Sequence, residues 1–397
     1  MSKLPPLGLY VHYPFCRRKC PYCDFNSYPK ARFSSQVSDG AYTKALLREL
    51  EAALPLLTGR RFISVFLGGG TPSLWPLEDL SAFLAKLQAL DLLSPQAEIS
   101  MEVNPGTAAD VAYFKELRAL GVNRLSIGVQ SFDDKALRSL GRIHDAKQAQ
   151  QSCAAAREAG FLRLNLDIMH GLPGQDEAAA LRDLDYASRY ATHLSWYELT
   201  LEEDSYFGAH PPVLPDEDTL AQIEEQGFAL LQELGFKRYE ISGFTREQPC
   251  VHNLNYWRFG DYLGLGAGAH SKISRISPHT SSIEVLRHAN PALPDAYLSA
   301  VQQDVHAMLY SAATAFAPVA AADLPFEYML NRLRLFESVP VAEYEAYTGL
   351  SFVPLLQTLK PALDDGLVTL SADGSKLNVT ATGHRLLNSV LELFLNA

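Results

Sequence analysis

The stretch YVHYPFCRRKCPYCDFNSY, residues 10–28, contains Cys16, Cys20 and Cys23, three of the five cysteines in a chain of 397 residues. The C-x3-C-x2-C spacing brings three thiolates close enough to hold one small object. Iron–sulfur clusters are held by cysteine thiolates, whereas a structural zinc ion usually takes four protein ligands. Three thiolates on a four-iron cube would leave one iron open to bind and activate another molecule.

Two other interpretations of these cysteines remain open. The thiols could join His12 or a distant residue around a structural zinc ion, although zinc ligands usually come as two separated pairs. A disulfide would leave one of the three thiols unpaired. Both interpretations fit the spacing less well than a cluster does.

The pattern C-x3-C-x-aromatic-C, with Tyr22 at the aromatic position, resembles the signature of the radical S-adenosylmethionine (SAM) superfamily. The resemblance implies that Cys16, Cys20 and Cys23 hold a 4Fe–4S cluster whose open iron chelates the amino and carboxylate groups of SAM. In that superfamily, an electron from the cluster breaks a carbon–sulfur bond of SAM and gives a deoxyadenosyl radical.

Composition narrows the class of protein. Lys and Arg number 34 and Asp and Glu number 45, which gives a formal net charge of −11. Nucleic-acid binding depends on basic residues that neutralise phosphates, so this acidity argues against a nucleic-acid partner. The N-terminus has neither the apolar run nor the cleavage site of a signal peptide. Clustered free thiols without one predict a reducing, cytoplasmic location.

One uncharged run of residues is long enough to raise the question of a membrane-spanning helix. Residues 305–322 contain no Asp, Glu, Lys or Arg, which is near the length of a membrane-spanning helix. Eight of them are alanine, which contributes little to insertion. We therefore expect a buried or surface-docked helix here rather than a span, and a peripheral membrane contact stays open.

Apolar strand-like runs and amphipathic helical runs alternate about every 30 residues, as in repeated βαβ units. The strands are expected at residues 8–13, 61–67, 97–103, 122–129, 161–169 and 192–200. The helices are expected at residues 41–57, 77–90, 108–120, 133–140, 145–159 and 176–190. Six parallel strands with crossover helices predict an α/β fold, a partial parallel (β/α)6 barrel.

Polar residues follow four of these strands at their carboxyl ends. Gly68–Pro72 follows the second strand, Glu102 ends the third, Gln130 ends the fourth, and Asp167 lies near the end of the fifth. In such a barrel these ends form one rim, where chemistry is placed. Each residue also has a local alternative, such as capping a helix, so the prediction rests on the set.

The superfamily resemblance assigns roles to these residues. It implies that Gly69, Gly70 and Thr71 meet the SAM amino group. The residues that would reach the ribose and methionine end of SAM are Glu102, Gln130 and Asp167. Arg142 would contact the SAM carboxylate, and Tyr10 would lie beside the cofactor.

A second unusual stretch is CVHNLNYW, residues 250–257, which contains His252, Asn253, Tyr256 and Trp257. A neutral histidine beside large aromatic rings can bind the iron of a flat macrocycle while the rings pack against its face. It can equally be a core histidine hydrogen-bonded under an aromatic cluster. The residues alone favour the core histidine.

The remainder of the chain predicts a division into three parts. Residues 1–270 would form the barrel with its extension, 271–323 a linker and Ala-rich insertion, and 324–397 a winged-helix-like domain of short helices and a hairpin. Residues 325–397 contain five Lys and Arg against eight Asp and Glu. This net charge of −3 favours a packing or lid role over DNA binding.

Several stretches together resemble one branch of the superfamily, the coproporphyrinogen III dehydrogenase (HemN) and HemW family: YVHYPFC, LGGGTPS, NPG, IGVQSF, GRIH, DIMHGLPGQ and HNLNYW. The dehydrogenase has a further cysteine where this chain has Phe25, and a longer segment before the cluster. The HNxxYW motif is that of the HemW type, which are haem chaperones.

This resemblance reverses the preference for a core histidine. It implies that His252, with Asn253, Tyr256 and Trp257, binds haem, and that a homodimer passes haem to acceptor proteins, respiratory enzymes among them. The alternative is a dehydrogenase that converts two propionates of coproporphyrinogen III to vinyl groups. Phe25 and the short N-terminus argue against that alternative.

Overall fold

The computed structural model describes residues 4–277, 282–311 and 316–395. Six parallel strands form the centre of its large sheet and adjoin in chain order. They are β1 (Leu7–Tyr13), β4 (Phe62–Gly69), β5 (Leu93–Val103), β6 (Arg124–Gln130), β7 (Arg163–His170) and β8 (His193–Glu198). The predicted partial parallel barrel is thus confirmed, with each of the six strands close to its expected place.

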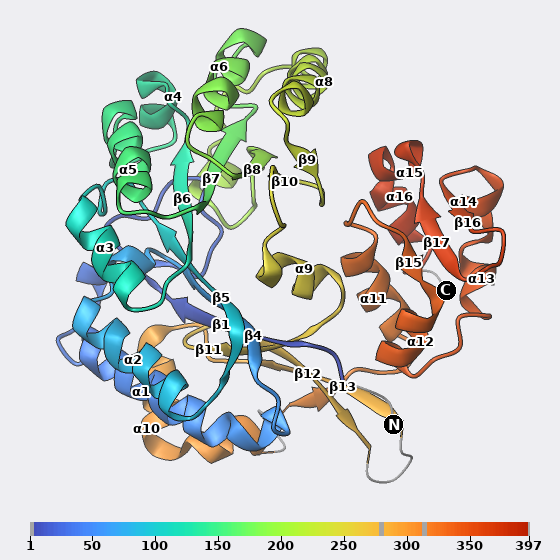
Figure 1. Cartoon of the computed structure of the whole chain (residues 1–397), viewed down its shortest axis with the longest axis horizontal. Helices are drawn as coiled ribbons and strands as arrows, with labels where there is room; N and C mark the ends of the chain where they lie inside the picture. The colour runs from blue at the N-terminus through green and yellow to red at the C-terminus, as the bar shows by residue number, and fades with distance from the viewer. Residues whose placement is uncertain (1–3, 278–281, 312–315, 396–397) are drawn as a thin grey trace.

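Crossover helices cover the outer face of this curved sheet (Figure 1). They are α1 (Asp39–Ala53), α2 (Leu77–Ala89), α3 (Val111–Ala119), α4 (Asp134–Ser139), α5 (Ala146–Glu158) and α6 (Glu177–Ser188). Ser38, Asp110, Asp133, Asp145 and Asp176 each accept a hydrogen bond from the first turn of the helix that follows. These caps fix where the helices begin. The outward apolar side chains of the strands pack under the helices and form the main core.

The sheet extends beyond both ends of the predicted barrel. After the long helix α8 (Glu217–Glu233), β10 (Gly243–Thr245) pairs antiparallel with β8, and β9 (Lys237–Arg238) pairs antiparallel with β10 at the edge of the sheet. At the other end, β11 (Asp261–Leu265) pairs parallel to β1. No strand was expected at residues 261–265, so sequence reasoning missed a seventh parallel strand.

The linker predicted at residues 271–323 is wrong for the described residues. β12 (His270–Ile276) and β13 (Ile283–Ala289) are paired strands of the large sheet, followed by α10 (Pro294–Tyr310) and the short β14 (Ala317–Pro318). α10 packs against α1 and buries Tyr297 and Val301. Residues 278–281 and 312–315, part of the predicted linker and Ala-rich insertion, lie outside the described residues. None of the described helices is both long and apolar enough to cross a bilayer.

The C-terminal part has its own core. It contains α11 (Leu324–Arg332), β15 (Val339–Pro340), α12 (Val341–Thr348), α13 (Leu355–Thr358), α14 (Lys360–Asp364), β16 (Val368–Leu370), β17 (Lys376–Val379), α15 (Ala381–Arg385) and α16 (Leu387–Glu392). The predicted short helices and hairpin are confirmed, and two short helices, α15 and α16, follow the hairpin. Phe259, from the end of the motif segment, packs into this core against Tyr328, so the two parts are joined there. The three-part division remains a prediction.

Candidate functional site

A cavity of about 470 Å³ lies inside the curve of the sheet. It is lined by Cys16, Cys20 and Cys23 together with seven of the eight residues predicted to meet SAM: Gly69, Gly70, Thr71, Glu102, Gln130, Arg142 and Asp167. Segments far apart in the sequence therefore meet at one place, as the strand-end pattern predicts. Their individual roles toward SAM stay predictions.

The cysteine loop follows β1 through the short β2 (Phe15–Cys16) and turns back at Cys23, whose N–H donates to Cys20 O at 3.1 Å. The Arg142 guanidinium lies 3.6 Å from Cys20 Sγ. Among the described residues, no three His, Cys, Asp or Glu side chains converge as they would around a single metal ion. The thiols border the cavity instead.

His12 is not placed as a fourth ligand. Its Nδ1 lies 2.8 Å from the Tyr10 hydroxyl and its Nε2 lies 2.8 Å from Asn26 O, so both ring nitrogens already have partners. The zinc alternative that used His12 therefore has no support in this arrangement. Tyr10 itself does not line the cavity, since its hydroxyl faces His12.

The three cysteine thiols at the cavity are suited to an iron–sulfur cluster, which binds thiolates. Burial raises the pKa of Cys16 to about 11, and the neighbouring thiols add to this; burial also raises the pKa of Cys23. Without iron these two thiols are protonated at neutral pH, so iron binding must release protons. The adjacent Arg142 cation would offset the negative charge of the resulting thiolates. These residues fit a 4Fe–4S cluster.

The glycines after β4 allow two chain segments to lie in contact. Gly69 has φ +120°, and a Cβ there would lie 2.8 Å from Tyr13 O. A Cβ on Gly70 would lie 2.7 Å from Phe15 O. Any side chain at either position would push the glycine segment away from the cysteine loop. Glycine is therefore required here for packing, whatever else its N–H groups bind.

Two buried carboxyl groups face each other at this rim. Burial, followed by the charge of Asp167, raises the pKa of Glu102 to about 8, although Gly69 N–H donates to its Oε2 at 3.0 Å. Burial likewise raises the pKa of Asp167, against hydrogen bonds from Ser195, Ser126 and Asn165. Glu102 is thus mainly protonated at pH 7. An arriving cation would favour its ionised form.

Gln130 ends β6 in a strained conformation. Its φ of 67° lies in the left-handed region, which residues other than glycine rarely adopt. The Tyr197 hydroxyl donates to its Oε1 at 2.9 Å. Backbone strain of this kind is often held at functional sites, and here it points the amide into the cavity.

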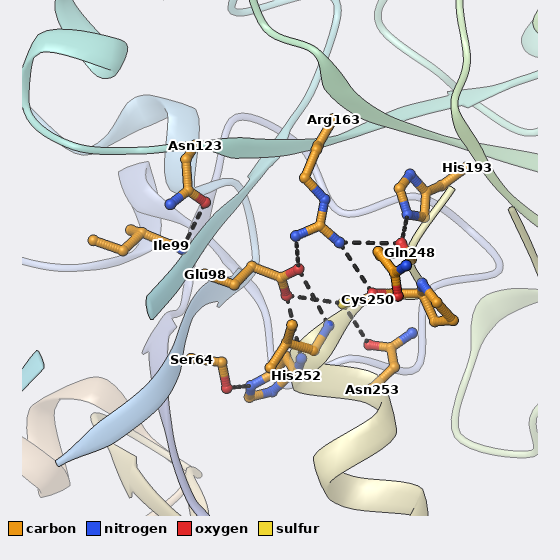
Figure 2. A network of polar contacts seen from close by, with 12 residues as sticks. Ser64, Glu98, Ile99, Asn123, Arg163, His193, Gln248, Cys250, His252 and Asn253 are labelled. Carbon is orange, nitrogen blue, oxygen red and sulfur yellow. Dashed lines mark hydrogen bonds and ion pairs between the residues drawn. The ribbon is translucent and has the colours of Figure 1, made fainter. Parts of the chain in front are cut away.

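The second motif forms a short helix, α9 (Val251–Trp257), on the inner side of the sheet between the strands and the C-terminal part (Figure 1). Glu98 of β5 accepts hydrogen bonds from the first residues of α9. Its carboxylate accepts from Val251 N at 3.1 Å and His252 N at 3.2 Å, and Cys250 Sγ lies 3.3 Å away. Figure 2 shows Glu98 between Arg163 and the start of α9, close to Cys250 and His252. The Arg163 guanidinium lies 2.7 Å from Glu98 Oε2.

His252 is buried at the base of this arrangement, with 6% of its surface exposed. Its Nδ1 lies 3.3 Å from Ser64 Oγ, and its ring stacks on Phe66 at 4.8 Å and tilts against Tyr256 at 4.9 Å. Burial lowers its pKa to about 3, so the imidazole is neutral at pH 7. This is the geometry of the core-histidine alternative.

The other motif residues differ in their surroundings. Asn253 lines the cavity, whereas His252, Tyr256 and Trp257 are not among its lining residues. Tyr256 stacks on Tyr262 at 4.0 Å, and the Arg334 guanidinium of the C-terminal part lies over the Trp257 ring at 4.4 Å. α9 is therefore held from the strands and from the C-terminal part together.

Sequence reasoning missed the charged residues beneath α9, which are Glu98, Arg124 and Arg163. A signal was present. Glu98 lies four residues before Glu102 in an apolar strand, and alternation puts both on the same face. A charged side chain on the inner face of a strand is expensive to bury and needs a partner.

Comparisons with known proteins agree with this architecture. Residues 10–187 match the model of the Radical SAM superfamily, and residues 319–386 match that of the HemN C-terminal domain. The heme chaperone HemW of Escherichia coli K12 is 42% identical over 397 residues, which cover 100% of both chains. The heme chaperone HemW of Haemophilus influenzae is 40% identical over 401 residues, with 100% of this chain and 99% of that one covered.

A solved structure shares the fold. The coproporphyrinogen III oxidase HemN of E. coli, described as a radical SAM enzyme, superposes with a TM-score of 0.79. The match covers 98% of this chain and 90% of that chain at 24% sequence identity. At that identity the likeness concerns the fold and not the activity.

Proposed function

Because the chain belongs to the family of the heme chaperone HemW, we propose that it binds haem and passes it to acceptor proteins, respiratory enzymes among them. The observation that carries the proposal is the full-length match at 42% identity to a relative of that name. The oxidase alternative has less support, since its solved representative is 24% identical and resembles this chain in fold.

The proposal includes a 4Fe–4S cluster on Cys16, Cys20 and Cys23, with SAM beside it. When bound, the cluster would supply an open iron that chelates SAM and an electron for its cleavage. The chain would supply the pocket: Arg142 offers a cation near Cys20, and the protonated Glu102 can ionise beside the positive sulfonium. Support comes from the cavity that these residues line together.

We further propose that His252 binds the haem iron, with Asn253, Tyr256 and Trp257 around the macrocycle. Its neutral imidazole suits iron, because no proton competes for the ring nitrogen at pH 7. Phe66 and Tyr256 now enclose the ring, so haem can reach it only if α9 shifts away from the strands. The short α9 and its two half-buried aromatic residues are suited to such a shift.

The family resemblance extends the proposal to a cytoplasmic homodimer. Clustered thiols that are free in this structure fit a reducing compartment. For delivery to membrane-bound acceptors, we propose a peripheral membrane contact. A soluble acceptor would need no such contact.

The test is an anaerobic comparison of two activities. Protein with a reconstituted cluster is loaded with haem and mixed with an apo-haemoprotein, and the absorbance of the acceptor is followed. The same protein is incubated with SAM, a reductant and coproporphyrinogen III. The proposal expects haem transfer and no protoporphyrinogen. Product without haem transfer would replace it with the oxidase alternative.

A further inference from the structure

The cavity continues down the inside of the barrel to the amino ends of the strands. Arg124 is the first residue of β6 and lines the cavity, as does Gly128 further along the same strand. At 3.3 Å per residue the two are roughly 13 Å apart. Gly128 O accepts from Arg142, the predicted partner of the SAM carboxylate. Arg124 therefore lies well below the cofactor residues.

We call Arg124 and Asn253, which both line the cavity, the cavity floor. Arg124 begins β6, and Asn253 reaches the cavity from α9. Ser100, the cross-strand neighbour of Arg124 on β5, lies next to this floor but does not line the cavity. The cavity floor is thus where the barrel interior and the haem motif meet.

The Arg124 side chain has no partner in the part of the chain that the structure describes. The residue is 3% exposed, no hydrogen bond or ion pair reaches its guanidinium, and its Nε is fully buried. The Ser100 hydroxyl beside it is also buried without a partner. A buried cation without a hydrogen-bonded counter-ion costs several kcal/mol. Such a group in a cavity is suited to an anionic ligand.

Neighbouring groups act on this cation through their charge but do not bond to it. Burial acts to lower the pKa of Arg124, yet the acidic groups around it, Glu98 and Asp167 among them, outweigh burial and raise the pKa. Glu98 makes its own contacts with Arg163 at 2.7 Å and with two backbone N–H groups of α9, and Asp167 accepts hydrogen bonds from Ser126 and Asn165. The N–H donors of the Arg124 guanidinium therefore remain for a ligand.

We propose that the cavity floor binds a carboxylate of the ligand, held by the Arg124 guanidinium. Guanidinium–carboxylate pairs can form two parallel hydrogen bonds, which Arg124 has free to give. Resting on the proposed function, the carboxylate is a propionate of haem. His252 precedes Asn253 on α9 but does not line the cavity, so a haem iron on His252 and a propionate on Arg124 together require the shift of α9 proposed above. A small free carboxylic acid is the other source of this chemistry.

The test compares haem with its dimethyl ester, in which both propionates are masked. Reconstituted wild-type protein and the Arg124→Gln variant are titrated with each, and Arg275→Gln, which removes an exposed ion pair with Glu284, is the matched control. Loss of a charge-assisted pair should weaken haem binding about ten- to a hundredfold. The ester should bind both proteins equally, and Arg124→Lys should recover part of the loss. Unchanged haem affinity, or an equal loss for the ester, would overturn the proposal.

Two further measurements separate the remaining explanations. Without ligand, the thermal midpoint of Arg124→Gln should stay close to that of wild type, because no hydrogen bond or ion pair joins this guanidinium to the described residues. A thermal midpoint lowered by several degrees, together with weaker binding of the ester, would indicate a purely structural role. The affinity for SAM should be unchanged. An equal loss of SAM affinity would show that Arg124 contributes to the SAM site instead.

The outcome also separates this site from the proposed function. If the wild-type protein binds no haem, the haem proposal fails. Sodium propionate then tests whether the cavity floor binds a carboxylate at all. Propionate that raises the thermal midpoint of wild type but not of Arg124→Gln would support a site for a small carboxylate. Equal shifts in both proteins would overturn the carboxylate site.

Discussion

Two glutamates on the inner face of β5 show how differently the rim and the floor of one cavity are built. Glu102, at the rim, has another carboxyl group as its charged neighbour, and burial raises its pKa to about 8. Burial also acts to raise the pKa of Glu98, near the floor, but Arg124, Arg163 and two backbone N–H groups outweigh it, and the pKa is lowered. Four residues apart, one carboxyl is protonated and the other ionised at pH 7.

This difference in pKa means that the two ends of the cavity respond differently to a ligand. A protonated Glu102 can change its charge when a cation arrives, so the rim can respond to a ligand. Glu98 keeps its charge because Arg124, Arg163 and two backbone N–H groups of α9 together outweigh burial. The charge at the rim can therefore adjust to a ligand, whereas the charge on Glu98 near the floor stays the same.

The largest effect is expected at the rim. Replacing Cys20 with alanine removes one of three thiolates and should abolish the iron–sulfur absorbance and the iron content after anaerobic reconstitution. The Cys153→Ala variant is the control, since Cys153 is a buried thiol on α5 away from the cavity. A Cys20→Ala protein that keeps its cluster would show that the cluster is not held by the three cysteines at the rim.

At the floor, the largest effect is expected on folding. Glu98→Gln breaks a buried ion pair and leaves Arg163 and Arg124 without their carboxylate, which should lower the free energy of unfolding by about 3–5 kcal/mol. Glu51→Gln removes a half-exposed pair with Lys86 and should cost about 1 kcal/mol at most. Urea denaturation measures both. Equal losses would mean that Glu98 is not an anchor.

A smaller effect separates haem from the cluster. His252→Ala should weaken haem binding by at least about tenfold, or 1.4 kcal/mol, while the iron content of the cluster stays the same. The exposed His270 on β12 supplies the control variant, His270→Ala, which should bind haem as wild type does. Haem titrations followed by absorbance give both affinities. Wild-type affinity in His252→Ala would place the haem ligand elsewhere.

The smallest effects concern pH, and they run in opposite directions at the two ends. The folded Glu102 keeps its proton above its ordinary pKa of 4.5, so its stabilising contribution is lost as pH rises toward 8. The folded His252 stays neutral below its ordinary pKa of 6.5, so stability is lost as pH falls toward 3. Both effects apply to the protein without ligands.

Urea denaturation of matched variants measures these two slopes. Between about pH 5 and 8, Glu102→Gln should lose less stability than wild type, because it has no proton to keep. Between about pH 6.5 and 4, His252→Gln should lose less than wild type for the corresponding reason. Other buried groups titrate equally in all three proteins. Parallel curves for a variant and wild type would contradict the environment assigned to that group.

The rim could be predicted from sequence because its residues follow short motifs and strand ends. The C-x3-C-x2-C spacing, the glycines after β4 and the strand-end residues Glu102, Gln130 and Asp167 are each recognisable locally. Parallel strands then bring their carboxyl ends together whatever the details of packing. The helices were equally clear, because an acidic or serine cap precedes five of the six crossover helices and Pro76 precedes α2.

The floor could not be predicted in this way. Glu98, Arg124, Arg163 and α9 lie far apart in the sequence and meet only through the pairing of β5, β6 and β7. The linker prediction failed for a related reason. Serine, proline and histidine around β12 resemble loop composition, yet residues 271–274 are all buried by pairing with neighbouring strands. Tertiary burial overrode local composition in both places.

The central claim is that the cluster occupies the rim while haem occupies the other end of the same molecule. An anaerobic haem titration of cluster-loaded protein tests it, with iron, sulfide and haem counted at each point. The account predicts one saturating phase of haem binding with the cluster content unchanged. Haem uptake that strips the cluster, or that occurs only after the cysteines are freed, would place haem at the rim and contradict the account.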